Sequence, residues 1–118
     1  MTANHFRRLA LAMTDVVEGA HMGHPDFRVG GKIFATLHSD LKHGMVVLTL
    51  EDQERFVREH PTHFVPENGA WGRQGCTRVA LASVDEETLG EAMTLAHQNI
   101  SLAAAAARSK PRARKKRS

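Results

Sequence analysis

The sequence predicts an α+β fold in which helices pack on one face of an antiparallel sheet. Hydrophobic residues recur at helical spacing near both ends of the chain, whereas alternating residues and glycine-containing turns fill the middle. The resulting order of helix, strands, helix, strand, helix contains too few helical crossovers for a parallel doubly wound sheet. We expect one domain over residues 1–107, followed by a disordered basic tail over residues 108–118.

The first predicted helix follows Thr2 or Asn4, either of which can cap its first turn. Its buried stripe has the i, i+3, i+4, i+7 spacing of one helix face and consists of Phe6, Leu9, Ala10 and Met13. Residues 15–31 are rich in turn formers. Gly30 and Gly31 lie between two extended runs and predict a hairpin turn, because glycine accepts a positive φ.

Two strands are predicted after this turn. Residues 32–38 alternate, which places Ile33, Ala35 and Leu37 on one side of the strand. A second hairpin turn over residues 39–44 leads into a strand over residues 45–50. The expected core residues of that strand are Val46, Leu48 and Leu50.

The second half of the chain is predicted to contain two helices and one strand. A short helix covers residues 52–60, residues 64–75 form a loop, and residues 77–82 return to strand. Ser83 or Asp85 caps the last helix. Its buried stripe consists of Leu89, Ala92, Met93, Ala96 and Ile100.

Length and composition bound the class of protein. The chain has 118 residues with 42% hydrophobic content, enough for one core, and no apolar run is long enough to span a bilayer. The first residues lack the order of a secretory signal. The lone cysteine, Cys76, excludes an intrachain disulfide and a thiolate-only zinc site. We therefore expect a cytoplasmic, monomeric protein that does not associate with membranes.

The positive charge is concentrated in the tail. Residues 108–118 hold seven cations and no acid, so residues 1–107 keep nine cations against 13 acids, a net charge of −4. The tail can bind phosphates by counterion release, or it can be a solubilising extension. Its basic residues beyond residue 111 are Arg112, Arg114, Lys115, Lys116 and Arg117.

His21 and His24 have a spacing that suggests a metal site, with Asp26 and Cys76 as further candidate ligands. Turn packing and hydrogen bonding explain this histidine pair better, because the pair lies in a segment broken by glycine and proline. We therefore expect no bound metal and no other cofactor. Cys76 is more typical of a small buried residue than of a nucleophile. The sequence contains no Ser–His–Asp order, paired-carboxylate motif or P-loop, so we expect no enzymatic activity.

Cations and one aromatic residue mark two glycine-containing turns. Arg28 and Lys32 flank the Gly30 turn, while Arg73 and Arg78 follow Trp71, the only tryptophan. Such turns suit nucleic acid, since cations meet phosphates and an aromatic ring can stack. Alternatively, Trp71 closes the edge of the core and the arginines form an ordinary solvated surface.

Two segments resemble the MmcQ/YjbR family, formerly a domain of unknown function. They are residues 21–37, with the sequence HMGHPDFRVGGKIFATL, and residues 66–81, with the sequence PENGAWGRQGCTRVAL. The resemblance extends from about Phe6 to Asn99. It implies a small bacterial α+β protein with a double-wing motif like that of the frataxin-like CyaY fold, and a DNA-binding function without a catalytic residue. It places the wings near residues 28–32 and 71–78.

Our leading hypothesis is non-specific, salt-dependent DNA binding through these basic hairpin wings and the tail. The alternative is a domain that binds a protein or a small ligand in a cleft near His21, His24 and Trp71.

Overall fold

The computed structural model describes residues 1–109. The predicted tail residues Arg112, Arg114, Lys115, Lys116 and Arg117 lie outside this range. The elements in order are α1 (Ala3–Leu11), β1 (Val16–His21), β2 (His24–Val29), β3 (Lys32–Leu37), β4 (His43–Val47), α2 (Leu50–Glu59), β5 (Phe64–Pro66), α3 (Gly69–Arg73), β6 (Cys76–Ala80) and α4 (Glu86–Ser109).

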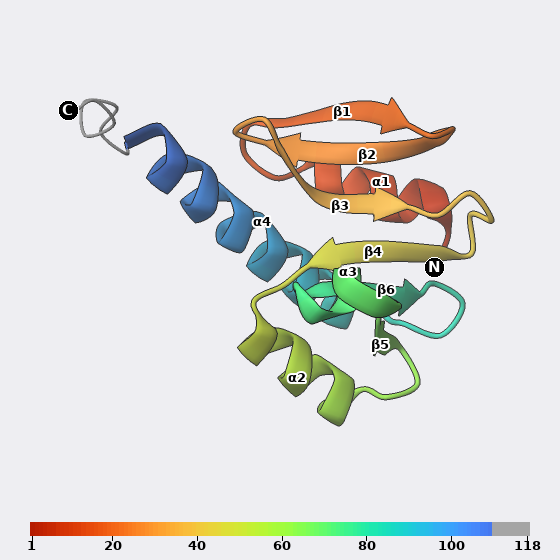
Figure 1. Cartoon of the computed structure of the whole chain (residues 1–118). Coiled ribbons are helices and arrows are strands. Elements are labelled where there is room, and N and C mark those ends of the chain that lie inside the picture. Colours follow the sequence, from red (N-terminus) through yellow and green to blue (C-terminus); the bar gives the residue numbers. More distant parts are fainter. Residues whose placement is uncertain (110–118) are drawn as a thin grey trace.

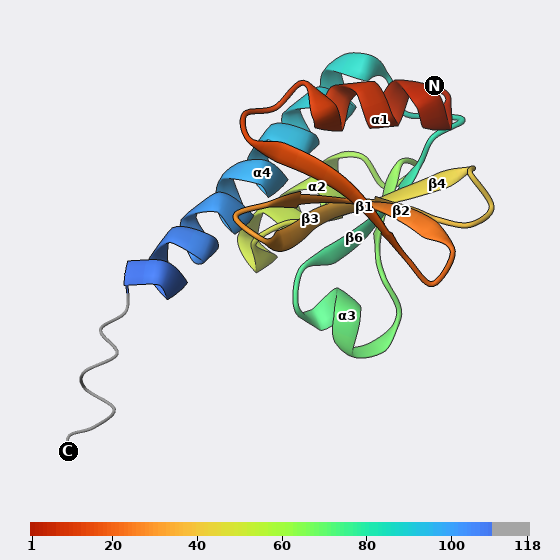
Figure 2. The same cartoon turned by 90° about the horizontal axis from the view of Figure 1, so that it is seen from above.

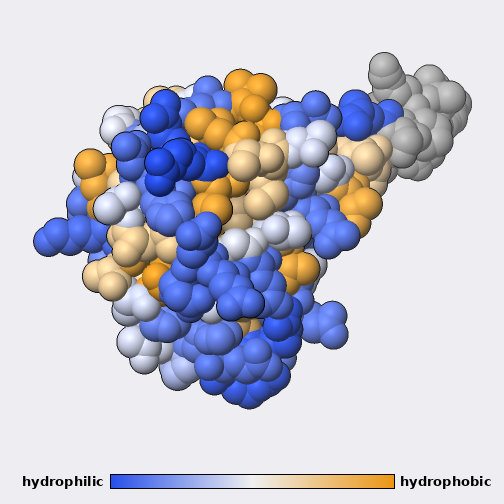
Figure 3. Space-filling view, turned by 180° about the vertical axis from the view of Figure 1, so that it is seen from behind, coloured by the Kyte–Doolittle hydropathy of each residue, from blue (hydrophilic) through white to orange (hydrophobic). Residues whose placement is uncertain are grey.

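The six strands form one sheet in the order β1-β2-β3-β4-β6-β5, and all neighbouring strands are antiparallel (Figure 1). The predicted α+β class with an antiparallel sheet is therefore confirmed. Helices α1 and α4 cover one face of the sheet, and α3 lies on the other side (Figure 2). The helix-covered side carries both hydrophilic and hydrophobic side chains (Figure 3). No helix within residues 1–109 is long and apolar enough to cross a membrane.

The hydrophobic core lies between the sheet and the two helices. Phe6 and Ala10 of α1 are fully buried against it, as the sequence predicts. Thr2 is the cap of α1, because its hydroxyl accepts a hydrogen bond from the backbone N–H of His5. Asp85 caps α4 in the same way through the N–H of Thr88. The predicted stripe of α4 is buried at Leu89, Ala92, Met93 and Ala96, and Ile100 is half-buried.

The segment predicted as turns around His21 is instead a β-hairpin formed by β1 and β2. Met22 and Gly23 make its two-residue turn with φ of 52° and 85°. Both φ values are positive, as a type I′ hairpin turn requires. Met22 occupies a position where glycine or asparagine is usual, so the sequence does not indicate this turn. The strand β1 is therefore missing from the prediction. His21 and His24 pair directly across this hairpin.

A bulge changes the predicted faces of β3. Phe27 pairs with Ala35, but Arg28 pairs with Ile33, so Phe34 is the extra residue of the bulge. Phe34 and Ala35 are both fully buried, and the Phe34 ring packs against His97 of α4 with centroids 5.3 Å apart. Ile33 therefore does not share the core face with Ala35, contrary to the simple alternation.

Two further boundaries differ from the prediction. Leu50 was expected in the core of a strand, but it is 57% exposed at the first position of α2. The hydroxyl of Thr49 accepts from the N–H of Asp52 and caps the helix there, so the strand ends earlier. Residues 64–75, predicted as a loop, contain the short elements β5 and α3. Gly75 follows α3 with a φ of 104°, and a Cβ there would overlap the backbone carbonyl of Leu48.

Candidate functional site

A cleft of about 570 Å³ lies on the sheet face opposite α1 and α4. Val46 of β4 is buried in the core, so its neighbours Met45 and Val47 point away from the helices and line the cleft. Ile33 also lines it, because the β3 bulge turns that side chain to this face. The polar lining residues include three histidines, His21, His24 and His38, together with Glu67, Asn68 and Gln74.

A buried carboxylate fixes one histidine of this cleft. Asp26 is fully buried, and its Oδ2 accepts a hydrogen bond from Nδ1 of His21 at 2.7 Å. Arg28 donates to the same carboxylate through Nε at 2.8 Å and Nη2 at 3.1 Å. The Arg28 hydrogen bonds hold the pKa of Asp26 below its usual range; burial opposes this shift and the His21 hydrogen bond adds to it. Gly19 makes room for the group, since a Cβ there would lie 3.0 Å from Oδ1 of Asp26.

The second histidine of the pair is held less firmly. The His24 ring meets the His21 ring edge-on, with centroids 4.8 Å apart. Its Nδ1 atom is buried and has no hydrogen-bond partner among residues 1–109. The two rings are therefore not equivalent, because a carboxylate orients His21 and no carboxylate within the described part of the chain is bonded to Nδ1 of His24.

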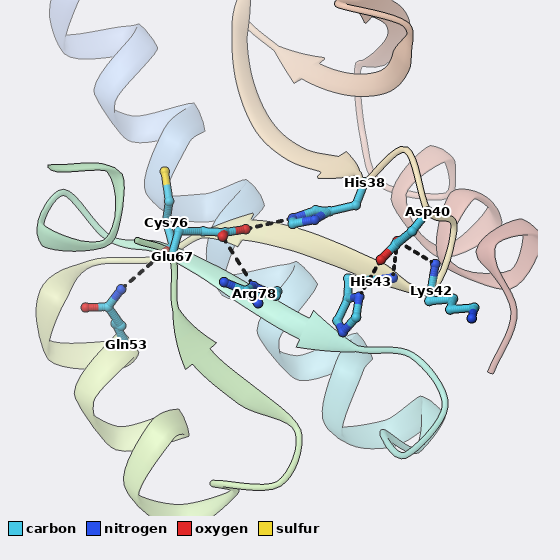
Figure 4. A network of polar contacts seen from close by, with 8 residues as sticks. All are labelled: His38, Asp40, Lys42, His43, Gln53, Glu67, Cys76 and Arg78. Carbon is cyan, nitrogen blue, oxygen red and sulfur yellow. Dashed lines mark hydrogen bonds and ion pairs between the residues drawn. The ribbon is translucent and has the colours of Figure 1, made fainter. Parts of the chain in front are cut away.

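A second carboxylate, that of Glu67, connects elements on the other side of the cleft. Glu67, just before α3, accepts from Nε2 of His38 at 2.7 Å and from Nε of Arg78 at 3.3 Å, and both side chains reach the same carboxylate (Figure 4). The Glu67 side chain is only 16% exposed. Sequence reasoning missed Glu67, because nothing in a loop-like segment indicates that its acid will meet a residue of a distant strand.

A neighbouring histidine belongs to a turn and not to the cleft. The Asp40 carboxylate accepts from the backbone N–H groups of Lys42 and His43 and from Nδ1 of His43 (Figure 4). The Lys42 N–H and then the His43 side chain lower the pKa of Asp40 to about 2. This network shapes the β3–β4 turn.

Trp71 lines the cleft from α3, and its side chain is 67% exposed. The interpretation that Trp71 closes the edge of the core is therefore wrong. The reason lies in the five-residue helix α3, which packs through its buried Gly72. A Cβ at Gly72 would overlap the carbonyl of Glu67. The helix therefore packs against the Glu67 backbone through glycine, and the neighbouring Trp71 indole stays on the surface.

Cys76 is buried at the start of β6 and also lines the cleft. Burial, and then the charge of Glu67, raise the pKa of its thiol. A raised pKa keeps the sulfur protonated at neutral pH and opposes nucleophilic or metal-ligand chemistry. Within residues 1–109, no group of three or more histidine, cysteine, aspartate or glutamate residues could hold a metal ion.

The predicted site residues thus separate into groups. The structure brings His21, His24 and Trp71 together in one cleft. Of the predicted cations, Arg28 and Arg78 are ion-paired with Asp26 and Glu67. Lys32 and Arg73 are exposed on different elements, at the start of β3 and at the end of α3, respectively.

Comparison with known proteins yields a family and a fold. The family model described as YjbR matches residues 11–99. Among curated proteins, none matches the chain. The crystal structure of Deinococcus radiodurans protein DR2400, described with a DUF419 domain, is similar with a TM-score of 0.73 and 18% sequence identity. The similarity covers 98% of this chain and 86% of that chain, so it extends over the whole architecture described above.

Proposed function

The chain belongs to the YjbR family, and we propose that it is a non-enzymatic binding protein that holds a small ligand in the cleft between the β1–β2 hairpin and α3. The observation that carries this proposal is the cleft itself. It has a volume of about 570 Å³ and an apolar part formed by Ile33, Met45 and Val47. Concave sites of about 300–1,000 Å³ with apolar walls and a few convergent polar groups are typical of small-molecule binding.

The titratable groups of the cleft support binding more than catalysis. The two carboxylates are already satisfied by arginine and histidine partners. The Cys76 thiol has a raised pKa, whereas a nucleophilic cysteine needs a lowered one. These groups therefore stabilise the walls of the cleft and leave no activated nucleophile there.

The chain contains its own reporter for this proposal, because Trp71 is the only tryptophan. A set of small neutral, cationic and anionic aromatic compounds is titrated into the full chain while its single indole N–H resonance is followed by NMR. We expect at least one class to shift this resonance saturably, together with the backbone resonances of His21 and Cys76. Leu50→Ala, which truncates an exposed side chain on α2, is the matched control and should bind equally. If no compound of any class shifts the cleft resonances, the proposal fails.

DNA binding is a second candidate, favoured by the position of the end of α4. A Cβ built at Gly30, in the β2–β3 turn, would lie 2.6 Å from Cβ of Ala104 and 3.3 Å from Nη1 of Arg108. Arg108, after which the other tail cations follow in the sequence, is thus beside the hairpin that carries the exposed Lys32. On this proposal, Lys32, Arg108 and the tail contact phosphates, whereas Arg28 and Arg78 are already paired with carboxylates.

A further inference from the structure

We infer that the ligand of this cleft is a small planar organic anion, such as an aromatic carboxylate, whose ring lies against Trp71 and whose anionic group meets His21 and His24. This inference rests on the proposed ligand-binding function and names the class of ligand. It is carried by the charge pattern of the lining, by the orientation of His21 and by the exposed indole.

The charged residues that the structure describes in the cleft include no free carboxylate that could pair with a cationic ligand. Glu67 is the only acidic residue among those that line the cleft, and its two oxygens already accept from His38 and Arg78. Asp26, behind His21, is fully buried and holds both His21 and Arg28. The lining instead offers the imidazole groups of its histidines and the side-chain amide N–H groups of Asn68 and Gln74. An anion therefore finds donors in the cleft, whereas a cation finds carboxylates that are already occupied.

The Asp26 carboxylate determines which atom His21 can offer. Because the arginine and histidine contacts keep Asp26 ionised, Nδ1 of His21 carries the hydrogen of their 2.7 Å bond. Nε2 is then the remaining polar atom of the ring, and on protonation it becomes a charged donor backed by the same carboxylate. Within residues 1–109, Nδ1 of His24 has no partner, so no hydrogen bond at that atom opposes adjustment of this ring to a bound group. A fixed ring whose Nε2 becomes a donor on protonation and an adjustable ring thus lie side by side.

Trp71 and the apolar wall explain why the anion should be planar and aromatic. The indole is 67% exposed, so a ligand ring that lies against it can bury a large apolar surface. Ile33, Met45 and Val47 supply apolar surface from the sheet in the same cleft. A flat ring covers both surfaces, and offset stacking on tryptophan adds to the area that it buries.

The test compares 2-naphthoate with its uncharged counterpart 2-naphthamide and with 2-naphthylmethylammonium, each titrated into the full chain at pH 6.5 by NMR. We expect 2-naphthoate to bind at least tenfold more tightly than the other two compounds. His21→Gln should reduce the ratio of the 2-naphthoate affinity to the 2-naphthamide affinity. His63→Gln is the matched control, because that histidine bonds Ser83 outside the cleft.

A measurement on the unmodified chain tests whether the surroundings of Trp71 favour anions over cations. Relative to its quenching of free N-acetyltryptophanamide, iodide should quench the fluorescence of Trp71 more strongly than caesium does. Equal or tighter binding of 2-naphthamide or the ammonium compound overturns the anion inference and leaves the cleft function intact. Stronger relative quenching by caesium overturns it as well. If none of the three compounds reaches the cleft and no other compound class does, both the inference and the proposed function fail.

Discussion

Nε2 of His38 lies 2.7 Å from Oε2 of Glu67, although 29 positions separate the two residues in the sequence. This contact joins the end of β3 to the chain that enters α3, and Arg78 of β6 completes it from the strand beside β4. The wall of the cleft that carries Trp71 is thereby tied to the sheet. The shape of the cleft depends on this carboxylate.

Glu67→Gln should therefore destabilise the protein and loosen the cleft. Hydrogen bonds to charged groups contribute about 1.5–3 kcal/mol, and the Glu67 side chain is only 16% exposed. We expect a decrease in the free energy of unfolding of about that size, measured by urea denaturation, with a shift of the Trp71 indole resonance. Glu54→Gln is the control, because that side chain is 77% exposed and its contact with Arg58 is 4.0 Å long. Equal stability of the two variants would show that the Glu67 contacts contribute nothing.

Asp26→Asn should destabilise the protein in a pH-dependent way. The pKa of Asp26 is lowered in the folded state, so its stabilisation is fully present above the unfolded value of 3.8 and is lost as the pH falls through the folded value. At pH 7 we expect a loss of about 1.5–3 kcal/mol, typical of hydrogen bonds to a charged group. Denaturation curves at pH 7 and below pH 3.8 should show the difference between variant and parent shrinking in acid. A difference that stays constant over this range would contradict the assignment.

Gly75→Ala should be among the most destabilising small substitutions in the chain. The residue has a φ of 104°, and the added methyl group would overlap the Leu48 carbonyl. Overpacking costs about 1–3 kcal/mol and a left-handed conformation about 1–2, so we expect a loss of about 2–5 kcal/mol. Gly90→Ala, in α4, meets no atom within 4 Å and should instead stabilise by about 0.5–1 kcal/mol. Thermal unfolding of both variants tests the opposite signs.

Trp71→Ala should leave stability almost unchanged, with a change below about 0.5 kcal/mol, because most of the indole is exposed. Phe56→Ala, at a fully buried ring, should cost about 3–5 kcal/mol. Chemical denaturation followed by circular dichroism compares them without using tryptophan fluorescence. A loss at Trp71 as large as that at Phe56 would restore the core-edge interpretation.

Glutamine in place of the seven tail cations should remove most duplex DNA binding by the full chain. If all seven cations engage phosphates, they contribute about −6 to the slope of log affinity against log salt, at roughly −0.9 per phosphate. Arg55→Gln with Arg58→Gln on α2 is the control and should change the slope little. An unchanged slope in the tail variant would assign DNA binding to the folded part. No binding by the unmodified chain would remove the DNA candidate.

The sequence by itself determined the features whose causes are local. The helical stripes of α1 and α4 and the Gly30–Gly31 turn follow from spacing and side-chain chemistry within a few residues. For the helix caps the sequence left Thr2 or Asn4 and Ser83 or Asp85 open, and the structure selects Thr2 and Asp85. The resemblance to the family also followed from two contiguous segments, and the match over residues 11–99 confirms it.

Only the tertiary structure decided the content of the cleft. The bulge at Phe34 depends on the register between β2 and β3, and it turns Ile33 to the cleft. Arg28 and Arg78 are ion-paired with Asp26 and Glu67, and these pairs determine how available the two arginines are to an external phosphate. Trp71 is exposed because Gly72 packs against the carbonyl of Glu67. Neither composition nor periodicity predicts this contact. Periodicity tells which side of its own element a residue occupies, but the partner that it meets there is determined by the packing of elements distant in the sequence.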